Sequence, residues 1–252
     1  MSLVDIPEIG LQIPQIPLAA KALAFCKEHC SEPVYNHAVR AAYWALIISQ
    51  RLPKTIAPSP DLDIVVVGCI LHDMGWARTA GLLSKDKRFE VDSANIARDF
   101  LDSQPLRETW GQDKIQRMWD GIALHATPSI AKFGAPEVAL IHLGVIADFV
   151  GPSVSLSTGE SDLILLDEYH AVMKLFPRAG FNRDGFKDIM CWLCHEKAET
   201  TYDNWVSGFG LKFGTDGNGT DRETFAHAWE ENQFASSLLL ALDKLEALDN
   251  TA

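Results

Sequence analysis

The chain has 252 residues, of which 47% are hydrophobic, and this is enough for a single domain with extensions and a sizeable core. There are 34 Asp and Glu residues against 22 Lys and Arg, which gives a formal net charge of −12. Nucleic-acid binding depends on a basic surface that displaces counterions, and the sequence has no run rich in Lys or Arg. The composition therefore argues against nucleic acid as a main partner.

The sequence also gives no sign of membrane insertion or export. No stretch approaches the roughly 20 apolar residues that a membrane helix needs. The opening "MSLVDIPEIGLQIPQIP" carries acidic residues and three prolines and does not resemble a secretory signal. Five cysteines in a chain of this size are typical of a protein that keeps its thiols reduced. We therefore expect a cytoplasmic protein with no membrane partner.

In chain order, almost every patterned segment has helical length or period, and strand alternation is scarce. One helix is expected to start in "PSPDLD" and run into His72 and Asp73, where Gly75 ends it. Other helices are expected at about 18–30, 36–51, 90–103, 111–126, 135–149, 161–176, 181–198 and 233–247. Loops are expected at 53–60, 127–135, 150–160 and in the glycine-rich 208–220. The sequence predicts an all-α fold.

Four ionisable side chains fall on apolar faces of three of these helices: His37, His72, Asp73 and Asp148. A single histidine on such a face is usually a core residue with one hydrogen bond. A buried carboxylate without a partner costs several kcal/mol, and no Lys or Arg lies on either aspartate's own helix face. One cation shared by all four removes this cost. A set of histidines and carboxylates suits Zn, Fe or Mn.

The order of these residues resembles the HD-domain superfamily of all-helical, metal-dependent hydrolases. His37, then the adjacent His72 and Asp73 after "GCIL", then Asp148 at the end of a later helix, match the pattern that supplies the metal ligands in that family. The resemblance implies one divalent ion, with zinc as first choice and iron or manganese as alternatives. It also implies one HD domain over 1–252, with a metal-binding core at about 30–150 and a C-terminal helical extension at about 160–248.

A narrower resemblance is to the cyanamide hydratase branch of this superfamily. It is carried by "YNHAVRAAYWALIISQRL", by "RFEVDSANIARDFL" after the HD pair, and by "LFPRAGF". Many HD phosphohydrolases have a phosphate-facing lysine where this chain has Trp76, and this difference favours a small neutral substrate. Trp76, Tyr43 and Arg78 are the candidate substrate contacts. Lys85, Lys87 and Arg88 could still supply charge from a nearby loop.

The resemblance implies a hydro-lyase or hydrolase in which a metal-activated hydroxide adds water to a nitrile-like substrate, such as cyanamide, giving urea. Asp73 would then be both a ligand and an orienting group. Candidates for acid–base catalysis are Glu90, Asp92 and His125. The two acids can equally be N-terminal charges favoured by a helix dipole. His125 can be a core histidine, a substrate contact or a ligand of a second metal.

Two other functions remain open at this stage. One is a phosphohydrolase acting on a nucleotide or another phosphorylated metabolite, and the other is a non-catalytic scaffold that binds a metal or a ligand. The string "CWLCH" at 191–195 matches a haem-attachment motif, but it lies within a helical pattern and lacks an export signal. The segment "SLLLALDKL" predicts a helix that packs on the core or on another subunit of a homo-oligomer.

Overall fold

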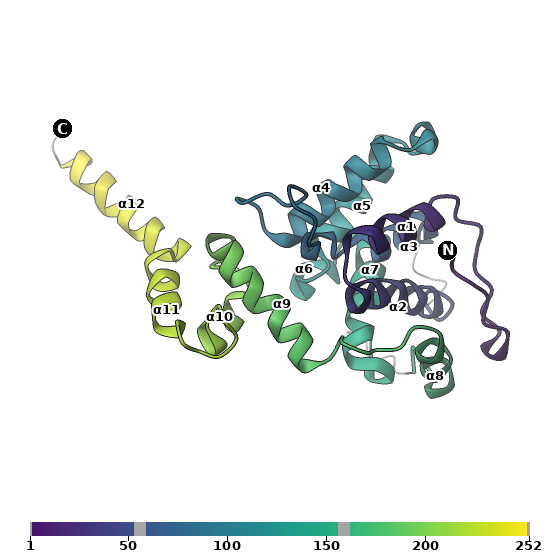
Figure 1. Ribbon diagram of the computed structural model, residues 1–252. Coiled ribbons are helices and arrows are strands. Elements are labelled where there is room, and N and C mark those ends of the chain that lie inside the picture. Colours follow the sequence, from purple (N-terminus) through teal and green to yellow (C-terminus); the bar gives the residue numbers. More distant parts are fainter. Residues whose placement is uncertain (1, 53–58, 156–161, 251–252) are drawn as a thin grey trace. The chain divides into compact units, whose positions relative to one another are not determined.

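The computed structural model describes residues 2–52, 59–155 and 162–250. The helices of this part of the chain, shown in Figure 1, confirm the predicted all-α fold. Within these ranges there is no strand, and one isolated bridge joins Ile6 to Leu11. No helix in the described ranges is both long and apolar enough to cross a membrane.

The described chain divides into two units. The first contains residues 1–83 and 89–181, and the second contains residues 84–88 and 182–252. The α-helices of the first unit are α1 (Ala19–His29), α2 (Glu32–Ser49), α3 (Leu62–Leu71), α4 (Phe89–Asp102), α5 (Gln112–Leu124), α6 (Pro128–Ala131), α7 (Pro136–Val150) and α8 (Leu166–Leu175). Short 3-10 helices cover Pro7–Ile9, Met74–Trp76, Pro105–Thr109 and Gly151–Ser153.

The second unit is helical as well. Its elements are α9 (Arg183–Glu196), a 3-10 helix at Ala198–Thr200, α10 (Ser207–Phe213), α11 (Arg222–Glu231) and α12 (Phe234–Asp249). Of the helices in the expected C-terminal extension, α8 belongs to the first unit and α9–α12 belong to the second.

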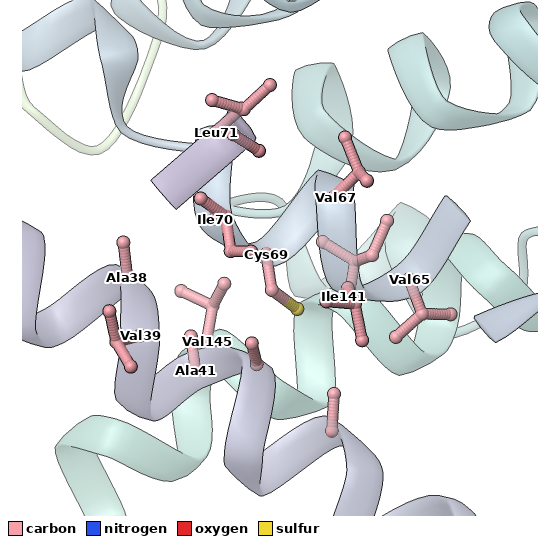
Figure 2. Close-up of a cluster of buried hydrophobic side chains, with 14 of the residues drawn as sticks. Ala38, Val39, Ala41, Val65, Val67, Cys69, Ile70, Leu71, Ile141 and Val145 are labelled. Carbon is pink, nitrogen blue, oxygen red and sulfur yellow. The ribbon is translucent and has the colours of Figure 1, made fainter. Parts of the chain in front are cut away.

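The core of the first unit lies where α2, α3 and α7 pack on one another. Figure 2 shows this contact, with small residues of α2 facing Cys69 and Ile70 of α3 and Ile141 and Val145 of α7. Gly144 allows α7 to approach α2 closely, because a Cβ atom there would lie 2.6 Å from the carbonyl oxygen of Ala41. This close packing brings His37 of α2 near the end of α3.

Several expected boundaries differ from the structure. Helix α2 begins at Glu32 rather than 36, because Pro33 occupies the first turn, where a missing N–H costs nothing. Helix α8 begins at Leu166 rather than 161. The expected loop at 127–135 contains α6. The expected loop at 53–60 lies mostly outside the described residues, as does the second half of the one at 150–160.

The glycine-rich segment 208–220 was expected to be a loop, but its first part is helix α10. Gly210 is a packing residue here, since a Cβ atom would meet the ring of Phe225 at 2.4 Å. Helix α11, which was not predicted, supplies that ring. The glycine therefore permits close helix packing rather than chain flexibility.

Candidate metal centre

The HD pair lies immediately after α3. Asp61 caps this helix by accepting a hydrogen bond from the Asp63 backbone N–H, and the apolar run that follows is buried throughout. The helix ends at Leu71, with His72 as its C-cap. Both residues of the pair were expected inside the helix, but Asp73 has a non-helical backbone, with φ −109° and ψ 22°. The turn after the helix aims both side chains into the protein, where each is buried.

His37, His72 and Asp73 form a compact group that could hold a metal ion. The two histidine Nε2 atoms are 3.2 Å apart, and Oδ2 of Asp73 lies 2.9 Å from Nε2 of His72 and 3.3 Å from Nε2 of His37. Ligand atoms bound tetrahedrally to zinc at about 2.0–2.1 Å lie roughly 3.3 Å from one another. The observed separations are therefore close to those of a metal site.

The hydrogen-bond donors of the histidines point away from this group. Nδ1 of His37 faces Oδ2 of Asp148 at 2.7 Å, and Nδ1 of His72 faces the carbonyl oxygen of Cys69 at 2.7 Å. Because these partners are acceptors, each Nδ1 carries a hydrogen, and each Nε2 faces Asp73, to which either a proton or a shared cation can join it. Among the described residues, the Asp73 carboxylate is paired only with imidazole nitrogens, those of His37, His72 and His125. A shared cation would satisfy all of these atoms at once.

His125 lies at the edge of the same group, at the C-terminal end of α5. Its Nδ1 faces the carbonyl oxygen of Ile122 at 2.6 Å, and its Nε2 is 3.7 Å from Oδ1 of Asp73. Burial lowers the pKa of His125 to about 3, so its imidazole is neutral at pH 7. His142 of α7 supports it by placing Nδ1 2.6 Å from the His125 carbonyl oxygen. A third imidazole lone pair is thus available beside Asp73.

Without a cation, the charges of the group are balanced by protons. Burial alone lowers the pKa of His37, but hydrogen bonds with Asp148 and Asp73 outweigh it and raise this pKa above its usual value. Burial alone raises the pKa of Asp73, yet the neighbouring His72 and His37 bring it below its usual range. The group therefore holds a carboxylate whose negative charge persists in a buried position.

Asp148 was expected as the fourth metal ligand, but the structure places it outside the compact group, behind His37. Its carboxylate accepts two hydrogen bonds from Arg40, at 2.8 Å from Nε and 2.7 Å from Nη2, and one from the indole N–H of Trp44 at 3.0 Å. Burial alone would raise the pKa of Asp148, but these bonds and His37 lower it well below its usual range. Here Asp148 orients His37 through Nδ1.

Arg40 is the residue that the sequence reasoning missed. It is one turn after His37 on α2 and fully buried. Its Nη1 donates to the carbonyl oxygens of Phe176 and Pro177 at 3.2 and 3.1 Å. The search for a partner of Asp148 considered only Asp148's own helix, whereas the cation comes from another helix. The three-residue spacing of His37 and Arg40 was the signal available.

Aromatic rings surround His37. The Phe181 ring is stacked on it at a centroid distance of 4.2 Å, and Trp76 lies parallel to it at 6.2 Å. Phe149 meets its edge at 5.4 Å. Helix α4 packs closely against the turn that carries Trp76. A Cβ atom on the preceding Gly75 would lie 2.1 Å from the Phe89 carbonyl oxygen, so this close approach requires glycine. The structure thus brings Trp76 to the group, together with Phe149 and Phe181, which the sequence analysis did not single out.

The remaining predicted site residues are not all brought to this group. Glu90 and Asp92 are both buried in the first turn of α4. The Tyr43 hydroxyl donates to the Val4 carbonyl oxygen at 3.0 Å and accepts from its N–H at 2.9 Å, so Tyr43 anchors the N-terminal segment. Arg78 is exposed, and its backbone N–H bonds to the carbonyl oxygen of His29.

The helical fold and its buried His–His–Asp group define a protein with a candidate divalent-metal centre. The HD domain family model matches residues 34–166, more than half of the chain, and the protein belongs to this family. HD domains are in general metal-dependent hydrolases. A comparison with curated proteins found no match.

Proposed function

We propose that this protein is a metal-dependent hydratase or hydrolase that adds water to a small neutral substrate containing a carbon–nitrogen multiple bond, such as cyanamide. The observation that carries the metal requirement is the convergence of two buried Nε2 atoms on the Asp73 carboxylate, at separations close to those of metal ligands. In this proposal His37, His72 and Asp73 hold the ion, and His125 is close enough to join them. When bound, a divalent ion supplies Lewis acidity and activation of water near neutral pH.

The protein's own residues orient and shield this chemistry. Asp148, fixed by Arg40 and Trp44, keeps the hydrogen of His37 on Nδ1, so that Nε2 stays available to the ion. The rings of Phe181 and Trp76 flank His37 and exclude bulk water from it. Electrostatic interactions at the site gain strength because the surroundings are dry.

Charge and burial support a small neutral substrate. Arg40 and Arg178 both direct guanidinium nitrogens at Asp148, so that carboxylate offsets part of their charge. Trp76 stands where many HD phosphohydrolases present a lysine. His72 is fully buried and Asp73 is 2% exposed, which favours a substrate of few atoms. Glu90, Asp92 and His125 remain the candidates for acid–base catalysis, and His125, as a neutral imidazole, would accept a proton rather than supply one.

The first experiment is to measure metal content by elemental mass spectrometry, after purification without a metal-affinity column. Wild type should contain about one zinc, iron or manganese ion per chain, and Asp73→Asn should lose it. Asp102→Asn, at an exposed aspartate, is the matched control and should keep the ion. A wild-type protein that takes up no metal on reconstitution would contradict the proposal.

Turnover then tests the substrate class. Cyanamide and simple nitriles are assayed against a panel of phosphoesters, with the metal content of each preparation known. We expect urea formation from cyanamide, lost in Asp73→Asn and retained in Asp102→Asn. Turnover of phosphoesters alone would instead identify a phosphohydrolase. Metal binding with no turnover of either class would identify a non-catalytic scaffold.

A further inference from the structure

Helix α12 presents an apolar surface that its own unit leaves exposed. None of its residues is buried. Phe234 is 70% exposed, and the leucines at 238, 239, 240, 242, 245 and 248 are 50–65% exposed. A single helix of this length is marginally stable in water unless it packs against something. Exposed apolar surface on this scale marks an interaction site.

The apolar residues of α12 contain a regular stripe. Phe234, Leu238, Ala241, Leu245 and Leu248 follow one another at intervals of four, three, four and three residues. This alternation is the seam of a two-stranded coiled coil, in which such residues of one helix insert between those of the other. We propose that α12 is a dimerisation helix, which pairs in parallel with α12 of a second copy of this chain.

The charged residues beside the stripe are complementary in this pairing. In a parallel coiled coil, a residue on one flank of the seam lies beside the residue five positions later on the opposite flank of the partner helix. Lys244 and Asp249 occupy these two positions, so each dimer contains the ion pair twice. Among the charged residues of α12 there are three acids and only this one lysine. Helices that bind anionic lipid surfaces have the opposite balance.

The exposed area indicates a dimer of low stability. Phe234, Leu238, Leu245 and Leu248 of the stripe together expose the equivalent of about 2.4 complete side chains. At roughly 100 Å² of apolar surface each, these four residues offer about 240 Å² per copy. Phe234 also lines a cleft of about 900 Å³ with Tyr202, Trp229 and several polar side chains. Stable complexes bury about 800 Å² per partner, so we expect a weak, reversible dimer.

Sedimentation equilibrium of the full chain between about 1 and 200 μM tests this proposal. Wild type should show a reversible monomer–dimer equilibrium, and Leu245→Glu should raise the dissociation constant at least tenfold. Leu240→Glu is the matched control, because Leu240 is 56% exposed against 55% for Leu245 but lies off the stripe. It should dimerise like wild type. Circular dichroism checks that both variants keep wild-type helicity.

Two further variants test the parallel arrangement. With oxidised glutathione, Leu248→Cys should form a disulfide-linked dimer, while Leu240→Cys and wild type should not. Lys244→Asp should weaken dimerisation, and adding Asp249→Lys should restore it.

The proposal is overturned by a wild type that is monomeric at 200 μM, by equal effects of the Leu245→Glu and Leu240→Glu variants, or by a larger oligomer. Binding of α12 to anionic lipid vesicles that is lost in Leu245→Glu would assign the stripe to membranes instead.

Discussion

Asp148→Asn is expected to destabilise the first unit strongly. Arg40 and Asp148 are both fully buried, and two hydrogen bonds of 2.8 and 2.7 Å join them. The substitution keeps the size of the side chain but removes its charge, so the guanidinium of Arg40 remains buried without a counterion. Breaking a buried ion pair from one side costs about 3–5 kcal/mol. This is a large part of the roughly 5–15 kcal/mol by which domains are stable.

The assay is urea unfolding of EDTA-treated protein, followed by circular dichroism, so that no bound metal contributes. Asp102→Asn provides the matched comparison, because Asp102 pairs with Arg107 at the surface, where its side chain is 52% exposed. That variant should lose no more than about 1 kcal/mol. Replacing both buried partners, in Arg40→Met with Asp148→Leu, should cost less than Asp148→Leu alone. Equal, small losses in Asp148→Asn and Asp102→Asn would refute the reasoning.

Two other predictions concern pH and packing. The pKa of Asp148 lies well below its ordinary value of 3.8, so at mildly acidic pH the unfolded chain takes up a proton there before the folded chain does. Its contribution to stability is therefore complete above about pH 5 and decreases as the pH falls further, and the urea midpoint of Asp148→Asn should depend less on pH over pH 3–5 than that of wild type. On α10, a Cβ atom at Gly208 has open space around it, so Gly208→Ala should raise the free energy of unfolding by up to about 1 kcal/mol, the difference in helix propensity between the two residues. Gly210→Ala, which meets the Phe225 ring, should destabilise by about 1–3 kcal/mol, and thermal unfolding that ranks the two variants in the reverse order would contradict this packing.

Local pattern predicted most of the helices because their apolar residues recur with helical spacing. The uninterrupted run before His72 and the segment before Asp148 are examples, and both form helices within a residue or two of the expected ends. The prediction missed α10 because glycine counts as a helix breaker unless its neighbours are known. The contact between Gly210 and Phe225, 15 residues later, is what makes glycine favourable there.

The candidate site could be predicted only in part, for a similar reason. The HD pair and His37 are recognisable because buried ionisable groups interrupt apolar faces. The arrangement of Asp148 depends on Arg40, more than 100 residues earlier, and on two carbonyl groups at 176 and 177. Such contacts between distant segments leave no periodic trace in the sequence. The aromatic neighbour Phe181 was missed for the same reason.

The segment after α8 has a consequence for how small the functional part of this protein can be. The family match ends at residue 166, yet the acceptors of Arg40 lie at 176 and 177, and the ring stacked on His37 is at 181. At the other end, Val4 holds the Tyr43 hydroxyl although the match starts at residue 34. A fragment trimmed to residues 34–166 would keep every proposed ligand and lose these supporting contacts of Arg40, His37 and Tyr43.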